Sequence, residues 1–378
     1  MEQNRSLQEE KLTMPLISTD HLFLVFAFFI IAALPTVPAA LYALTSTAAE
    51  PLHVPSNRDD DPRYFSNSFM ALLKNDLSSH QVTQLLQRTG HENAIMDKYI
   101  FVRDTSFLKP VSELRQERTD QRICLFNDVA RLPEETLWLG DAYTPKDFEL
   151  GKKAILRTLR CDGKLLLHPE SRIIRWVDAS WIYAMGPLTL PGRTSATQRI
   201  SLSIGIQFER LFAPLIEVFE LDASTPHEPV VIPSPPGNAE RWSHQHDDTQ
   251  DQQRKVFDDH LYIADNTSLS GDIVCHGDLY LGKNCRCEGN LKVDGHLYVD
   301  SGTAIHGHVF CLGSVFMGND CQINGMTSVL NHFHSGLNCM VGSEKQPITL
   351  AAGEISLSAG SRIYGQIIAR KKGMTTYA

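Results

Sequence analysis

Histidines in the last third of this 378-residue chain have side chains that could do chemistry. Two H-x-H pairs stand out there, together with two single residues: His276, His296, His306, His308, His332 and His334. A neutral imidazole can bind a metal ion, and it can also act as a general base. A third pair, His244 and His246, is followed by Asp247 and Asp248, which together would suit a surface metal ion. Which chemistry is available depends on the elements that hold these residues.

Carboxylates form a second candidate group in the middle of the chain. Asp141, Asp147, Glu149 and Asp162 lie near an aromatic-rich stretch that contains Tyr143, Trp176, Trp181 and Tyr183. Paired carboxylates can serve as acid and base in glycoside hydrolysis. Their spacing does not put two of them on one face, and roles in turns or at strand edges explain them more simply.

The eight cysteines do not show the spacing of a zinc site. Cys285-x-Cys287 is shorter than the usual C-x₂₋₄-C ligand pair. Five cysteines fall at apolar positions of a repeat, where a thiol behaves as a small hydrophobe: Cys275, Cys285, Cys287, Cys311 and Cys321. Cys321 and Cys339 are the one pair whose spacing allows a bridge. Buried free thiols favour a reducing compartment.

An eighteen-residue repeat holds most of these residues, from Asn266 to about Leu337. One column of the repeat contains glycine in all four units: Gly271, Gly289, Gly307 and Gly325. A second column contains Gly277, Gly295 and Gly313, with Asn331 in the fourth unit. Self-similarity at a fixed period indicates a stacked-repeat fold.

Each unit divides into three six-residue pieces whose first and fifth positions are almost all apolar or small. This alternation is typical of short strands with one buried face. Three strands and their corners would form a triangular rung, and rungs would stack at the strand spacing of about 4.8 Å. We therefore predict a mainly β chain that ends in a three-faced β-helix over 256–370. Its predicted core ladder consists of Leu269, Ile273, Leu279, Leu291, Val293, Leu297, Ile305, Val309, Val315 and Ile323.

The h-x-G-x-h pieces, the Val/Ile/Leu/Cys ladders and the uninterrupted units resemble the bactofilins, which are bacterial polymer-forming cytoskeletal proteins built on a β-helix. The resemblance is strongest over about 256–370, and the segments GDAYTPKDFELG and FERLFAP resemble stretches of membrane-anchored relatives. It implies a scaffold rather than an enzyme, with no cofactor and with the chain itself as partner. It also allows for unidentified envelope or cell-wall proteins as partners.

A β-helical enzyme is the alternative function. Hexapeptide acyltransferases use a catalytic histidine, and γ-class carbonic anhydrases hold zinc with three. The histidines of this repeat fall between ladder positions and should point outwards. Such enzymes also need loops or a cap to build a pocket, whereas these units carry no insertion.

The N-terminal part predicts a membrane anchor. Residues 21–46 contain no charged residue and are long enough to cross a hydrocarbon core of about 30 Å. A cleaved signal peptide fits less well, because the polar tail at 1–20 contains acidic residues. Flanking cations do not decide the orientation; the resemblance and the thiols favour a single-pass inner-membrane protein with a cytoplasmic bulk. The net charge of −9 and pI of about 5.9 argue against nucleic acid.

Between the anchor and the repeat we expect a mixed helical and strand region at 62–134, with a helix over 62–74. A looser solenoid-like section follows at 135–222, and a linker rich in Pro, His and Asp at 223–255 is expected not to order itself. After the repeat, the strand pattern continues to residue 370, and a short tail covers 371–378.

We expect the last rung to be an open end. An uncapped β-helix exposes unpaired backbone groups and an apolar cross-section, which can template another copy. The residues expected to form this self-association surface are Ile355, Leu357, Ile363, Ile367 and Ile368.

Overall fold

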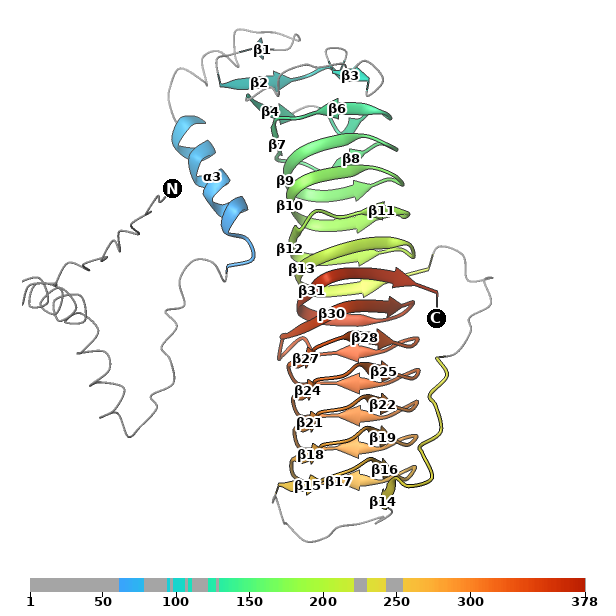
Figure 1. The fold of residues 1–378 in the computed structure, drawn as a ribbon. Helices are drawn as coiled ribbons and strands as arrows, with labels where there is room; N and C mark the ends of the chain where they lie inside the picture. Colours follow the sequence, from blue (N-terminus) through green and yellow to red (C-terminus); the bar gives the residue numbers. More distant parts are fainter. Residues whose placement is uncertain are drawn as a thin grey trace, which may run out of the picture. The chain divides into compact units, whose positions relative to one another are not determined.

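The computed structural model describes residues 61–77, 94–95, 98–105, 108–110, 122–126, 129–220, 230–242 and 254–377. Asp61–Ala378 forms one compact unit. Its described residues are mainly β and build a β-solenoid of about 13 turns, with one short helix, α3 (Tyr64–Leu77) (Figure 1). The predicted mainly β solenoid is therefore confirmed.

The C-terminal section of the solenoid, residues 254–377, has short strands that repeat at every rung. In chain order, with the edge strand that precedes them, they are β14 (Glu240–Trp242), β15 (Lys255–Phe257), β16 (Leu261–Ile263), β17 (Ser268–Leu269), β18 (Ile273–Cys275), β19 (Leu279–Leu281), β20 (Arg286–Cys287), β21 (Leu291–Val293), β22 (Leu297–Val299), β23 (Ala304–Ile305), β24 (Val309–Cys311), β25 (Val315–Met317), β26 (Gln322–Ile323), β27 (Thr327–Val329), β28 (His332–Ser335), β29 (Met340–Val341), β30 (Ile348–Ser358) and β31 (Arg362–Thr376).

These strands form three parallel faces. Face A contains β15, β18, β21, β24 and β27. Face B contains β14, β16, β19, β22, β25 and β28. Face C contains β17, β20, β23, β26 and β29. The long strands β30 and β31 round the corners and join the faces.

Side chains at matching positions stack along the inside of each face. On face B, for example, Leu279, Leu297, Val315 and Phe333 are register partners in successive rungs. All ten residues of the ladder predicted from the repeat are at most 3% exposed. Burial of such side chains is worth about 1.5–3 kcal/mol each, so the ladders are the main stabilising element of this section.

Two corner positions explain the polar and glycine columns of the repeat. A Cβ added at Gly307 would collide with the carbonyl oxygen of Gly289 one rung away, so this corner accepts only glycine. At another corner the backbone is left-handed in successive rungs, with positive φ at Asn284, Gly302 and Asp320. Asn, Asp and Gly tolerate this conformation better than other residues.

The N-terminal section, residues 94–220, continues the same architecture, with short strands first and four later strands of ten to thirteen residues. They are β1 (Ala94–Ile95), β2 (Tyr99–Val102), β3 (Lys109–Pro110), β4 (Ile123–Phe126), β5 (Arg131–Leu132), β6 (Thr136–Trp138), β7 (Asp141–Thr144), β8 (Phe148–Leu150), β9 (Ile155–Leu167), β10 (Arg172–Ala184), β11 (Leu188–Thr189), β12 (Arg193–Leu202) and β13 (Ile206–Val218). Strands β9, β10, β12 and β13 pair in parallel, with bulges where they turn from one face to the next.

Helix α3 packs against the outside of this section. Phe69 meets the Trp176 ring edge to face at 5.5 Å, and Leu73 joins a buried cluster with aromatic and aliphatic residues of β2 and β4. The helix predicted at 62–74 is thus found at Tyr64–Leu77. Among the residues that the structure describes, no helix is long and apolar enough to cross a bilayer. The predicted transmembrane segment 21–46 lies outside those residues.

The two sections stack in an order that the sequence did not suggest. The order of the segments along the chain would place the looser section, 135–222, next to the beginning of the regular repeat. Instead, β13 pairs with β31 in antiparallel orientation, so the N-terminal section joins the C-terminal end of the repeat. Figure 1 shows β13 and β31 side by side in the middle of the stack.

Part of the linker is ordered, contrary to expectation. Residues 230–242 run towards the first rung of the C-terminal section and end in β14, which pairs with β16. The amide of Glu240 donates to the carbonyl of His260 at 2.8 Å, and the amide of Ala264 donates to that of Trp242 at 2.9 Å. These ladder bonds give the linker a fixed end despite its polar composition.

Candidate functional site

The junction between β13 and β31 is the contact that unites the two solenoid sections, and it extends over all three faces. The amide of Gly205 donates to the carbonyl of Thr375 at 3.1 Å, and the amide of Val218 donates to that of Ser361 at 2.9 Å. The buried hydroxyl of Thr375 accepts from the amide of Ile206 at 2.9 Å and donates to the carbonyl of Ser203 at 2.7 Å. Two rung ends thereby satisfy each other's backbone groups.

The apolar core continues through this junction. Leu211 is the register partner of Ile367 and Ile216 is that of Ile363, and all four side chains are buried. Phe208 lies opposite Gly373, and a Cβ added to this glycine would collide with the edge of the Phe208 ring. The two ends are therefore complementary in shape as well as in hydrogen bonding.

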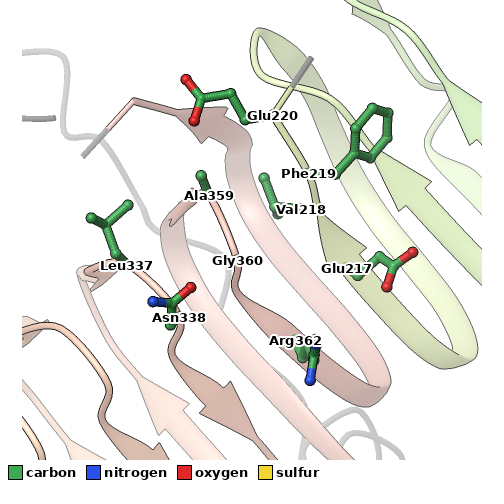
Figure 2. Close-up of a pocket in the computed structure, with 9 residues that line it drawn as sticks. All are labelled: Glu217, Val218, Phe219, Glu220, Leu337, Asn338, Ala359, Gly360 and Arg362. Atoms are coloured by element: carbon green, nitrogen blue, oxygen red, sulfur yellow. The ribbon is translucent and has the colours of Figure 1, made fainter. Parts of the chain in front are cut away.

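A groove of about 520 Å³ opens where the two sections meet. Figure 2 shows that Val218, Phe219 and Glu220 line one side of it, whereas Leu337, Asn338 and Arg362 line the other. An adjoining hollow of about 610 Å³ shares Glu217 and Arg362 with this groove and also contains Trp181 and Arg199. The Glu217 carboxylate accepts from Ser201 at 2.8 Å and lies 3.3 Å from Arg199, so its charge is already balanced within the chain.

The structure places the predicted C-terminal association residues inside the molecule. Ile355, Leu357, Ile363 and Ile367 are at most 1% exposed, and Ile368 is half-buried beside Arg210. The expectation of an open end at this rung is therefore wrong, because β13 covers it. An apolar rung at the end of a solenoid can pack against another molecule or against another part of the same chain. The sequence pattern of that rung does not distinguish the two partners.

The first rung forms the other end of the C-terminal section. Strands β14, β15 and β17 pair with the following rung on one side only. Val256 in β15 is 54% exposed, and Phe257 contacts Trp242 edge to face at 5.8 Å. The Lys255 ammonium lies 4.6 Å from the centre of the Trp242 ring. Val256 points outwards from this rung, whereas the inward side chains of Phe257, Leu261 and Ile263 are at most 8% exposed.

The histidines of the repeat bond from one rung to the next. Nδ1 of His296 accepts the amide of Ser314 at 3.1 Å, and Nδ1 of His308 accepts that of Met326 at 2.9 Å. His276 bonds to Asp294 at 2.7 Å, His306 bonds to Asn324 at 2.9 Å, and His332 lies 3.4 Å from Glu354. His334 is stacked in the outer column next to Phe316, and burial lowers its pKa. Most of these rings thus secure corners of the solenoid.

The four candidate carboxylates also have local partners. Asp141 accepts from Thr158 at 2.8 Å and Asp147 from the amide of Lys164 at 2.7 Å. Glu149 bonds to His168 at 2.5 Å, and Asp162 accepts from Tyr143 at 2.8 Å. In the described residues, no group of three or more His, Cys, Asp or Glu side chains could hold a metal ion. The pair His244 and His246 lies outside those residues.

All eight cysteines are buried, and none of them forms a disulfide. Burial raises the pKa of Cys311 to about 11 and that of Cys161 to about 12, which keeps these thiols protonated at neutral pH. Cys321 and Cys339 are neighbours in successive rungs, as the repeat predicts, and no disulfide joins them.

A buried ionic cluster under α3 was missed by the sequence reasoning. Asp178 is fully buried and accepts from Arg63 at 2.8 and 3.0 Å, from Ser66 at 2.6 Å and from Ser195 at 2.6 Å; Arg160 also bonds to it. Burial lowers the pKa of Arg63. The cluster fixes the start of α3 to three successive strands. A single Asp in an apolar strand was the only signal in the sequence, and its partners are distant along the chain.

Comparison of the chain with protein-family models, with curated proteins and with solved structures finds no match.

Proposed function

We propose that this chain is a membrane-tethered structural scaffold of the bactofilin type that self-associates through an end of its solenoid. The junction of β13 with β31 is the observation that carries the proposal. It is an example, within one chain, of two rung ends joining through backbone bonds and a continuous apolar core. The same physics acts on any solenoid end that is left uncovered.

The end that we assign to association between molecules is the first rung of the C-terminal section. Among the described strands, β17 of this rung pairs only with β20, and Val256 of β15 is an exposed apolar side chain of the same rung. A contact between two such ends would be isologous and would give dimers, whereas a contact with a different end would give filaments. A tether through 21–46 would raise the local concentration and favour weak contacts.

Light scattering after size-exclusion chromatography and negative-stain microscopy of the full chain test this proposal. We expect oligomers whose mass rises with concentration, and we expect Val256→Asp to shift them towards monomers because it places a charge beside the contact. Ala304→Asp is the matched control, because Ala304 lies on face C away from either end. A wild-type chain that stays monomeric, or equal assembly by both variants, would refute self-association through this end.

A further inference from the structure

Exposed apolar side chains are concentrated on one side of the solenoid. We define the A side as helix α3, the outward side chains of face A, and the corner between faces A and B. Thirteen large apolar side chains are exposed among the described residues, and eight of them lie on this side: Tyr64, Phe65, Leu72, Ile174, Val256, Phe310, Leu312 and Leu330. They extend over both sections, and only Val256 among them belongs to the rung that we assign to self-association.

Positive charge accumulates on the same side. Six exposed cations are found on face A or at its corner with face B: Arg175, Arg193, Arg210, Arg370, Lys371 and Lys372. The acids near these cations are Glu209 and Glu354, and the latter lies 4.0 Å from Lys371. Elsewhere on the A side Lys292 pairs with Asp294 at 3.6 Å, and Asp258 and Asp259 are exposed at the corner of the first rung. The A side is therefore basic around the junction, in a chain whose net charge is −9.

Face C provides the contrast. Its arginines lie beside carboxylates on the same face: Arg131 is 3.5 Å from Glu149, Arg199 is 3.3 Å from Glu217, and Arg286 pairs with Glu288. The uneven distribution of charge is thus a property of the A side and not of the solenoid as a whole.

We infer that the A side is a docking surface for an anionic lipid bilayer, on which the solenoid lies along its length. Exposed aromatic and aliphatic side chains among Lys and Arg fit the boundary between headgroups and acyl chains. Charge complementarity selects acidic headgroups, since each basic residue near such a surface contributes to binding. Helix α3 is the first described element after the predicted span 21–46, and the Asp178 cluster holds it on the A side. The inference rests on the membrane tether of the proposed function but not on self-association.

Two serine-to-cysteine variants of the full chain can report which side meets the lipid. Ser328 lies on face A in register with Phe310, and Ser268 lies on face C. The native cysteines are buried, so a fluorophore will label the new thiols. The labelled chains are mixed with vesicles of phosphatidylcholine, or of phosphatidylcholine with phosphatidylglycerol, that carry a headgroup nitroxide quencher. Flotation reports binding of the chain separately.

We expect quenching at position 328 and not at position 268, and only with phosphatidylglycerol present. It should disappear in 1 M salt, where the Debye length is about 3 Å. Replacing Arg210, Lys371 and Lys372 by Gln should lower the affinity for anionic vesicles by about fivefold per residue. The control replaces Arg131, Lys164 and Arg286 on face C by Gln, which changes the net charge equally and should leave quenching at position 328 unchanged.

Equal quenching at both positions, or none at position 328, would overturn the inference. If the chain still floats with neutral vesicles in that case, the tether stands and only the lipid-facing side is wrong. A chain that floats with neither kind of vesicle would overturn the tether as well. Contact between labels at position 328 of two molecules, without quenching by lipid, would assign the A side to a second copy and would also overturn the inference.

Discussion

The two sections of the solenoid reach the same architecture by different means. In the C-terminal section, strands of two to four residues repeat at an eighteen-residue register up to β29, and each rung uses the same corners and ladders. In the N-terminal section, strands of up to thirteen residues round the corners through bulges, and helix α3 with the Asp178 cluster secures the outside. A regular rung is held by its neighbours, whereas an irregular one requires a partner from elsewhere in the chain.

The largest effect should follow from removing Asp178, which would break the irregular section. Asp178→Ala leaves Arg63 and Arg160 without their buried partner, and we expect a loss of about 3–5 kcal/mol in the free energy of unfolding. Urea denaturation measures this change. Asp141→Asn is the control, since Asp141 is partly exposed and 3.9 Å from Arg157; it should cost at most about 1 kcal/mol. Equal costs for the two variants would show that the cluster does not hold this section together.

A ladder residue tests the regular section in the same way. Leu291 is fully buried between Ile273 and Val309, and Leu291→Ala should cost about 2–5 kcal/mol through lost burial and a cavity. Because each rung contacts mainly its neighbours, hydrogen exchange should rise in the adjacent rungs and remain low in β9 and β10. Faster exchange that spreads evenly over both sections would contradict the difference between them.

The junction can be weakened without touching either section's own ladders. Gly373→Ala places a methyl group against the Phe208 ring, and we expect a cost of about 1–3 kcal/mol in thermal or urea unfolding. Gly237→Ala is the control, because nothing lies within 4 Å of a Cβ added there. Phe208→Leu should partly restore the stability of the Gly373→Ala variant. If it does not, the cost of Gly373→Ala does not arise from contact with the Phe208 ring.

The smallest expected effect concerns pH and the half-buried His334. Its pKa is lowered below the ordinary value of 6.5, so the unfolded chain binds this proton more readily than the folded chain. The stabilising contribution is complete above pH 6.5 and declines as the pH falls through the lowered folded pKa. His334→Phe, which extends the column of Tyr298 and Phe316, should reduce the loss of stability between pH 7.5 and 5.5. An unchanged pH profile would argue against burial of this imidazole.

The sequence predicts the regular section well because its information is local. The apolar ladder positions and the glycine corners recur every eighteen residues, and each residue contacts its counterpart one rung away. The junction could not be predicted in this way, because Leu211 and Ile367 are far apart in sequence and the apolar pattern of β31 suits any rung end. The Asp178 cluster could not be predicted for the same reason. Its partners Arg63, Ser66 and Ser195 are distant along the chain and come together only in the folded structure.

The most direct test of this account is an intrachain cross-link across the junction. Glu217 and Arg362 are register partners on β13 and β31, and antiparallel partners have Cα atoms about 4.5–5.5 Å apart, within reach of a disulfide. We predict that the Glu217→Cys/Arg362→Cys chain, mildly oxidised, forms a disulfide within one molecule, whereas Glu217→Cys/Gln322→Cys does not. Absence of the bond, or bonds formed only between molecules, would contradict the joining of the two sections within one chain.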